Sequence, residues 1–291
     1  MKDPILWILV AIVIGGLIWG EPARQDDYHH QPNWVAEERR LPLSRPPNED
    51  DQLRGRVADD DRDGLPFSDA RQGRMVSADG RRVFSHAELA GAMRGIEPEQ
   101  RSLTYHWTRA DGSVFAFSAE STERRYYFAP AFLTGWQPFP ANQLWQPWYA
   151  VAHRMRYAWD HELFPGRMDV WQTGYQSWLH QRGDCEDHAL LLADWLMNMG
   201  EDARVVLGDW RGEGHAWVVL IRDERVYLLE ATQKFGRQAL REYPLASMMA
   251  GYQPRAMFNR ETLWVNEGSS LTTRYTDERW RKAGFFESYF N

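Results

Sequence analysis

The 291-residue chain has a single cysteine, Cys185, and no broad excess of either charge. One cysteine excludes an internal disulfide, so its role must be packing, metal binding or reactivity. The net charge is −7, and residues 21–75 account for −4 of it, with nine arginines against thirteen acids. The remainder is close to neutral, which indicates neither a nucleic-acid-binding surface nor a strongly acidic one. No nucleic-acid partner is therefore expected.

Cys185 stands at the beginning of a predicted helix whose body is rich in leucine. Asp184 is a favourable N-cap residue, and Glu186 and Asp187 suit the positive end of the helix dipole. The same dipole and the unpaired amides stabilise a thiolate, the nucleophilic form of cysteine. The flanking carboxylates oppose that effect, so a reactive Cys185 needs a basic partner. The alternative is that Cys185 is a small buried hydrophobic residue.

His215 is the candidate for this basic partner. It lies at the entrance of an apolar run, Gly214 to Ile221, whose length and β-branched content predict a buried strand. His188, three residues after Cys185, is the competing histidine. It would have to reach back to the N-terminus of its own helix, and no acid partner is evident there. The sequence therefore favours His215.

A second predicted strand, residues 225–232, supplies an acid for His215. The two strands form a predicted hairpin that closes through Asp223 and Glu224. Counting back along the ladder from this turn places His215 and Glu230 on the same sheet face, as diagonal neighbours roughly 7 Å apart. A three-residue loop would shift the register and put Glu230 on the opposite face. That spacing lets a carboxylate orient an imidazole. Thiol, imidazole and acid would then activate one another.

Three segments in this order and spacing resemble the transglutaminase-like cysteine peptidase superfamily. They are Gly-Asp-Cys-Glu-Asp around Cys185, Gly-His-Ala-Trp-Val around His215 and Leu-Leu-Glu-Ala-Thr around Glu230, and residues 169–173 look like that family's lead-in. The resemblance covers about residues 147–255 and implies an α+β, papain-like fold. It implies the same catalytic positions, although the third is usually aspartate in the family and is Glu230 here.

The resemblance also raises a calcium site. In relatives within this superfamily, acids beside the catalytic cysteine bind calcium, and Asp184 and Glu186 are the same residue types at matching positions. Helix capping is the alternative explanation for both acids. The expected chemistry requires no cofactor, and calcium is the possible ion. Zinc is not expected, because one cysteine and scattered histidines lack the usual ligand spacing.

The oxyanion of an acyl-transfer intermediate also needs a donor. The amide of Cys185 is the expected one, with Gln172 or Gln181 as side-chain candidates.

The sequence divides into five segments. Residues 4–20 are uncharged and apolar, which predicts a single membrane-spanning anchor, and a cleaved signal peptide is the alternative. We expect an inner (cytoplasmic) membrane protein with a periplasmic catalytic domain. The predicted segments are an anchor (1–20), a flexible acidic linker (21–75), a small α+β extension (76–145), the peptidase domain (146–260) and an aromatic C-terminal tail with a short helix from Thr276 (261–291).

Three local motifs refine this division. Ser85 and Glu88 form a predicted capping box, and residues 103–108 and 114–117 form a predicted hairpin. Asp169 is predicted to cap a helix in which Trp171 and Trp178 share one face.

The predicted function is acyl transfer from a protein or peptide amide through a Cys185 thioester, with water as the acceptor. One alternative is a cross-linking transglutaminase, which shares the acyl-enzyme. The other is a membrane-anchored binding or assembly subunit that keeps the fold without turnover. The substrate, and any partner in a membrane complex, cannot be identified from these residues.

Overall fold

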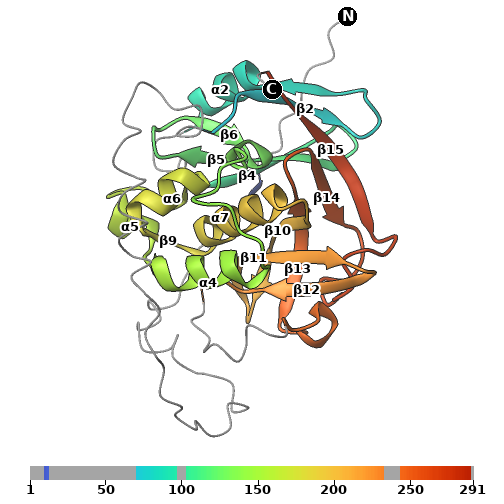
Figure 1. The fold of residues 1–291 in the computed structure, drawn as a ribbon. Helices are drawn as coiled ribbons and strands as arrows, with labels where there is room; N and C mark the ends of the chain where they lie inside the picture. Colours follow the sequence, from blue (N-terminus) through green and yellow to red (C-terminus); the bar gives the residue numbers. More distant parts are fainter. Residues whose placement is uncertain (1–9, 13–69, 97–102, 233–242, 290–291) are drawn as a thin grey trace, which may run out of the picture. The chain divides into compact units, whose positions relative to one another are not determined.

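The computed structural model describes residues 10–12, 70–96, 103–232 and 243–289. The described elements form a mixed α/β arrangement (Figure 1). The helices are α2 (His86–Arg94), α4 (Trp145–Arg154), α5 (Asp160–Leu163), α6 (Gly174–His180) and α7 (Cys185–Asn198), with short 3-10 helices η2 (Ala129–Phe132) and η4 (Ala246–Met248).

An eight-stranded antiparallel sheet runs in the order β12-β11-β10-β13-β14-β15-β2-β3. The sheet therefore joins strands from four of the predicted segments, because β2 crosses the boundary between the predicted linker and the extension. Its strands are β2 (Gly73–Ser77), β3 (Val83–Ser85), β10 (Asp202–Trp210), β11 (Glu213–Arg222), β12 (Arg225–Leu229), β13 (Tyr252–Phe258), β14 (Thr262–Asn266) and β15 (Trp280–Ser288).

A second sheet has the order β1-β4-β5-β6, with β8 pairing in parallel with β5. A third, two-stranded sheet pairs β7 with β9 in parallel. These strands are β1 (Val10–Ile12), β4 (Thr104–Thr108), β5 (Val114–Ser121), β6 (Tyr126–Phe128), β7 (Arg156–Tyr157), β8 (Val170–Trp171) and β9 (Arg182–Gly183).

Helix α7 lies at the centre of the core. All its residues from Cys185 to Leu196 are buried, as expected for a helix that is apolar nearly all round. It contacts strands β10 and β11 on one side and helices α4 and α6 on others (Figure 1). This packing fixes the helix N-terminus, and with it Cys185, against the strand that carries His215.

Several predicted elements are confirmed. The Ser85–Glu88 capping box begins α2, and the predicted hairpin forms as β4 and β5. β11 and β12 pair with Arg222 opposite Arg225, which is the predicted register. Both turn residues, Asp223 and Glu224, have positive φ, 50° and 60°, as a tight two-residue hairpin turn requires.

The helix predicted from Thr276 is wrong. Residues Trp280–Ser288 instead form β15, which pairs with β14 on one side and β2 on the other. The two neighbouring strands thus provide hydrogen-bond partners for the backbone amides and carbonyls of this segment. Gly284 explains the preference locally, because glycine disfavours a helix interior and here lets the backbone of Phe115 in β5 approach closely.

The helix predicted to begin at Asp169 is also corrected. Val170–Trp171 form β8, and α6 begins only at Gly174, capped by Thr173 and Gln176 in a capping box. The Asp169 carboxylate accepts a hydrogen bond from Trp171 Nε1 at 2.8 Å. That bond and the β5–β8 pairing hold this stretch extended.

The predicted membrane helix lies mostly outside the described residues. Within it, Val10–Ile12 form β1, antiparallel to β4, which differs from a helix at those three positions. Among the described residues, no helix is long and apolar enough to cross a membrane. The anchor, the linker and the cellular location remain predictions.

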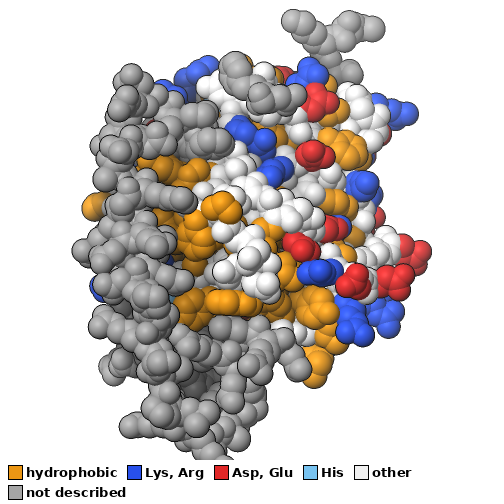
Figure 2. Space-filling view, in the orientation of Figure 1, with side chains coloured by type: hydrophobic (Ala, Val, Ile, Leu, Met, Phe, Trp, Pro, Cys, Tyr) orange, Lys and Arg blue, Asp and Glu red, His pale blue; other side chains and the backbone are white. Residues whose placement is uncertain are grey.

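The face seen in Figure 2 shows basic and acidic side chains interspersed over the side occupied by β12–β15 in Figure 1. This mixture agrees with the near-neutral charge of the chain after residue 75.

Candidate active site

The Cys185 thiol is buried, with 4% of the residue exposed. It donates a hydrogen bond to Glu186 Oε2 at 3.2 Å, and the backbone amide of Ala216, next to His215, lies within hydrogen-bonding reach of the sulfur. Burial raises the thiol pKa well above its ordinary value, and the neighbouring Asp184 carboxylate raises it further. Without a compensating positive charge, Cys185 is therefore protonated at neutral pH.

His215 and Glu230 meet as the hairpin register requires. His215 Nε2 lies 2.7 Å from Glu230 Oε2, and both side chains are buried. Because an ionised carboxylate only accepts hydrogen bonds, this contact places the proton of neutral His215 on Nε2. The other ring nitrogen, Nδ1, is then the one able to take a proton from a thiol.

Glu230 is held by several donors. Its Oε1 accepts from the Thr232 amide at 2.9 Å and the Thr232 hydroxyl at 2.6 Å, and its Oε2 also accepts from the Tyr252 hydroxyl at 3.1 Å. Burial works to raise the Glu230 pKa, but His215 and Thr232 outweigh it and the pKa is lowered. Trp148 Nε1 binds the Glu230 carbonyl at 2.9 Å and fixes the backbone. Glu230 is thus an ionised acid in a buried setting.

Aromatic rings surround His215 on the sheet face. Trp210, Trp217 and Tyr252 have ring centroids 5.7, 6.1 and 6.1 Å from the imidazole. These apolar rings lower the local dielectric constant and so strengthen the electrostatic interaction between the His215 imidazole and the Glu230 carboxylate.

The two glutamine candidates for the oxyanion site lie elsewhere. The Gln172 amide nitrogen donates to Asp187 Oδ2 at 2.5 Å and to the Arg182 carbonyl at 3.0 Å. Both amide hydrogens are used, so Gln172 braces Asp187. Gln181 ends α6 with φ 54° and is exposed. The Cys185 backbone amide, which the sequence predicts as the donor, is the better candidate. The Ala216 amide, which was not predicted, is a second one.

The competing histidine, His188, is bound to its own helix. Its Nδ1 lies 2.7 Å from the Asp184 carbonyl, and its ring stacks on Tyr157 at 6.2 Å.

Five buried acids lie beside the thiol. Oxygen atoms of Asp160, Asp169 and Glu186 lie within 4.8 Å of one another, as do those of Asp160, Asp184 and Asp187. None of the five residues is more than 3% exposed. We call these residues the acid cluster. Asp184 and Glu186 are the metal candidates predicted from the sequence, whereas Asp160, Asp169 and Asp187 were not predicted in that role.

Helix capping does not account for the acid cluster. Within the described residues, the Asp184 side chain makes no capping hydrogen bond, although Asp184 occupies the N-cap position. As ionised acceptors, Asp160 Oδ1, Asp184 Oδ1 and Glu186 Oε1 are buried and receive no hydrogen bond among the described residues. Asp184 and Glu186 bind each other only when Asp184 carries a proton to donate. Buried carboxylate oxygens without partners are costly. They fit a site for a hard cation, whose preferred ligands are carboxylate oxygens.

Burial raises the pKa of every member of the acid cluster. The pKa of Asp169 rises to about 6 and that of Asp187 to about 7. The pKa values of Asp160, Asp184 and Glu186 lie well above their ordinary range, through burial first and neighbouring negative charge second. Mutual repulsion therefore keeps part of the cluster protonated near neutral pH in the absence of a cation.

The part of the chain that contains the candidate active site is similar in sequence to known proteins. Residues 169–280 match the family model described as the CEP76 peptidase-like domain. A curated relative, centrosomal protein of 76 kDa from Xenopus tropicalis, is 40% identical over 55 residues. That match spans 19% of this chain and 8% of the relative.

Solved structures of LapG from Legionella pneumophila are also similar. The calcium-bound form has 18% identity and a TM-score of 0.36, covering 47% of this chain and 75% of that one. The EGTA-treated form has 18% identity and a TM-score of 0.34, covering 42% and 65%. The segment that holds Cys185, His215 and Glu230 is thus the part of the chain that is similar in sequence to a peptidase-like domain.

Proposed function

We propose that this chain is a cysteine peptidase of the transglutaminase-like type, with Cys185 as nucleophile, His215 as base and Glu230 as the residue that orients the base. The observation that carries the proposal is the 2.7 Å contact between His215 Nε2 and an ionised, fully hydrogen-bonded Glu230, on the strand whose Ala216 amide reaches the sulfur of Cys185. Matching an imidazole with a buried acid beside a helix-terminal thiol is the arrangement that activates a nucleophile.

The proposed reaction has two steps. His215 Nδ1 takes the Cys185 proton, the sulfur attacks an amide carbonyl, and the imidazolium then protonates the leaving amine as the C–N bond breaks. Water, deprotonated by His215, then attacks the thioester and releases the acid product and the thiol. The backbone amides of Cys185 and Ala216 are the proposed donors to the oxyanion.

The acid cluster is the proposed site of a divalent cation, and calcium is the ion that suits it best. Asp160, Asp184 and Glu186 would hold it through their unpartnered oxygens, with Asp169 and Asp187 completing the negative charge. When bound, the cation would supply positive charge beside the thiol and offset the carboxylates that raise the thiol pKa.

A non-catalytic binding subunit is the second candidate. The burial of Cys185 and its raised pKa favour it, because both make the thiol a poor nucleophile. A cross-linking transglutaminase would use the same acyl-enzyme, with an amine as the acceptor.

A comparison of the released and cross-linked proteomes of wild type and Cys185→Ala separates these functions. A peptidase releases fragments in the wild type only, a transglutaminase forms cross-links in the wild type only, and a binding subunit gives neither difference. Labelling with a thiol-directed electrophile at pH 6, with and without calcium chloride, provides a direct check. No labelling under either condition would contradict a nucleophilic Cys185.

A further inference from the structure

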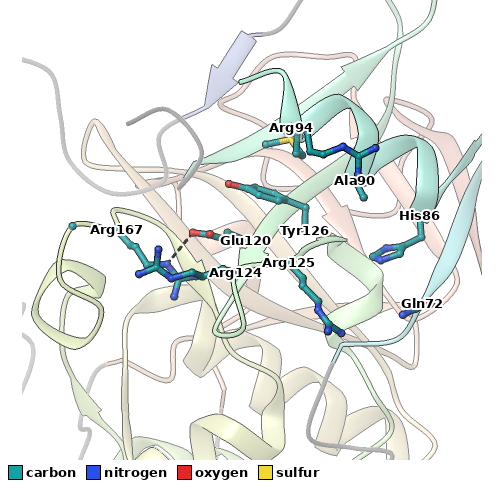
Figure 3. A pocket seen from close by; sticks show the side chains of 11 residues that line it. Gln72, His86, Ala90, Arg94, Glu120, Arg124, Arg125, Tyr126 and Arg167 are labelled. Atoms are coloured by element: carbon teal, nitrogen blue, oxygen red, sulfur yellow. Dashed lines mark hydrogen bonds and ion pairs between the residues drawn. The ribbon is translucent and has the colours of Figure 1, made fainter. Parts of the chain in front are cut away.

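A pocket of about 660 Å³ shares no lining residue with the candidate active site. Helix α2, the turn between β5 and β6, and the segment before β8 form its walls (Figure 3). Its volume is within the range of small-molecule sites, about 300–1,000 Å³. The question is which chemistry its lining recognises.

The pocket wall is strongly basic. Arg94, Arg124, Arg125 and Arg167 line it, and among the described lining residues Glu120 is the single acid. Glu120 is neutralised by Arg167, whose Nε lies 2.9 Å from Glu120 Oε2 with both side chains 8% exposed. The wall therefore keeps a net positive charge, although the chain as a whole has a net charge of −7.

Arg167 also makes the wall rigid. Its guanidinium donates to the carbonyls of Ser121 and Thr122, at the base of the turn that presents Arg124 and Arg125. A pre-organised wall loses less conformational entropy when a ligand binds.

Arg124 occupies an unusual backbone position. Its φ is 62°, in the left-handed region that glycine or asparagine occupies at lower cost. The arginine is exposed and lines the pocket beside an acid that is already paired. The hairpin turn between β5 and β6, in which the Arg124 amide donates to the Ser121 carbonyl at 3.0 Å, accounts for this φ and sets the position of the arginine in the pocket wall.

We propose that this pocket binds a small polyanion carrying phosphate or carboxylate groups. Guanidinium groups bind both through paired, charge-assisted hydrogen bonds. Arginines from three separate elements line the pocket, which suits a ligand with more than one anionic group. Figure 3 shows these side chains placed around the cavity, together with Tyr126 and His86, which provide further hydrogen-bonding groups.

The test is isothermal titration calorimetry of the full chain with pyrophosphate and, separately, citrate, at matched ionic strength. We expect saturable binding of at least one, and Arg124→Gln should weaken it about tenfold, the effect of losing one charge-assisted hydrogen bond. Arg94→Gln is the second variant, with an expected loss of the same size. Arg94 and Arg125 make other contacts as well.

Arg225→Gln is the matched control, because Arg225 is an exposed arginine of β12 that does not line the pocket. It should leave the affinity unchanged. Pyrophosphate binding alone would identify a phosphate ligand, and citrate binding alone a carboxylate ligand. Absence of binding of both anions, or equal affinity in wild type and both pocket variants, would overturn the proposal. Neither outcome depends on peptidase activity.

Discussion

The Tyr252 hydroxyl donates a hydrogen bond to the same Glu230 oxygen that His215 contacts, at a distance of 3.1 Å. Tyr252 comes from β13, whereas His215 and Glu230 belong to the β11–β12 hairpin region. Burial and the nearby Glu230 charge raise the Tyr252 pKa far above 10, so its hydroxyl stays a donor at all relevant pH values. Tyr252 is thus a positioning residue for the acid.

Replacing Tyr252 by phenylalanine removes the hydrogen bond that its hydroxyl donates to Glu230 Oε2, so the carboxylate should be less firmly oriented. Loss of one hydrogen bond to a charged group costs about 1 kcal/mol or more, so kcat/KM should fall about fivefold or further. The Glu230 pKa should rise, which moves the acidic limb of the pH–rate profile to higher pH. A pH series of peptide hydrolysis measures both effects.

Tyr243→Phe is the control for Tyr252→Phe. The Tyr243 hydroxyl donates to the Leu144 carbonyl at 2.9 Å, so this variant also loses one tyrosine hydrogen bond but does not touch the Glu230 carboxylate. An equal shift of the acidic limb in the two variants would argue against a positioning role for Tyr252.

Glu230→Gln should remove the charge that orients His215 while keeping nearly the same volume. The amide can present its nitrogen to His215, which favours the wrong tautomer, so we expect kcat/KM to fall by about 10²-fold or more. Thr232→Val removes one hydroxyl donor to Glu230 and should cost far less. Retention of wild-type kcat/KM by Glu230→Gln, measured in parallel with melting temperature, would contradict the proposed mechanism.

The meeting of His215 and Glu230 could be predicted from sequence because it depends on local register. The turn at Asp223 and Glu224 fixes the pairing, and the two-residue periodicity of a strand then fixes which side chains share a face. The helix that begins at Cys185 could also be predicted from the sequence, because its N-cap residue and its apolar residues lie in one continuous stretch.

The acid cluster could be predicted only in part. Asp184 and Glu186 flank Cys185, but Asp160 and Asp169 reach the cluster from α5 and the start of β8, and no periodicity links those segments to α7. Asp169 also reads as a good helix cap, a local preference that the parallel pairing of β8 with β5 overrides. Long-range pairing decided the position of β15 in the same way.

The acid cluster should make stability depend on pH and on calcium. Burial raises the pKa values of Asp169 and Asp187 to about 6 and about 7 from an ordinary 3.8. The folded state therefore holds these protons more tightly than the unfolded chain. Their contribution favours folding below about pH 4 and is lost as pH rises through 6 to 7. In EGTA, the melting temperature should fall over this window.

Calcium should reverse that loss. At pH 7.5, a calcium concentration about a hundredfold above Kd should raise the melting temperature by about 5–10 °C, and the increase should be smaller at pH 5, where more of the cluster is protonated. Glu186→Gln should reduce the shift, whereas Glu162→Gln, which changes an exposed acid of α5, should not. Identical calcium shifts in wild type and Glu186→Gln would exclude the acid cluster as the site.

Gly284 tests the position of β15, the element that differs most from the sequence prediction. A Cβ atom at this position would overlap the carbonyl oxygen of Phe115 and come within 3.0 Å of Met75 Cε. The first obstacle is a backbone atom, which cannot rotate aside, so Gly284→Ala should lower the free energy of unfolding by about 1–3 kcal/mol.

Gly91→Ala is the matched control in α2. The atom nearest to a Cβ at Gly91 is the flexible end of Arg94, at 3.7 Å. Because alanine favours a helix, this variant should leave stability unchanged or slightly increased. Urea unfolding of both variants measures the difference. Wild-type stability in Gly284→Ala would mean that β15 does not pack against β5 of the second sheet as closely as the structure has it.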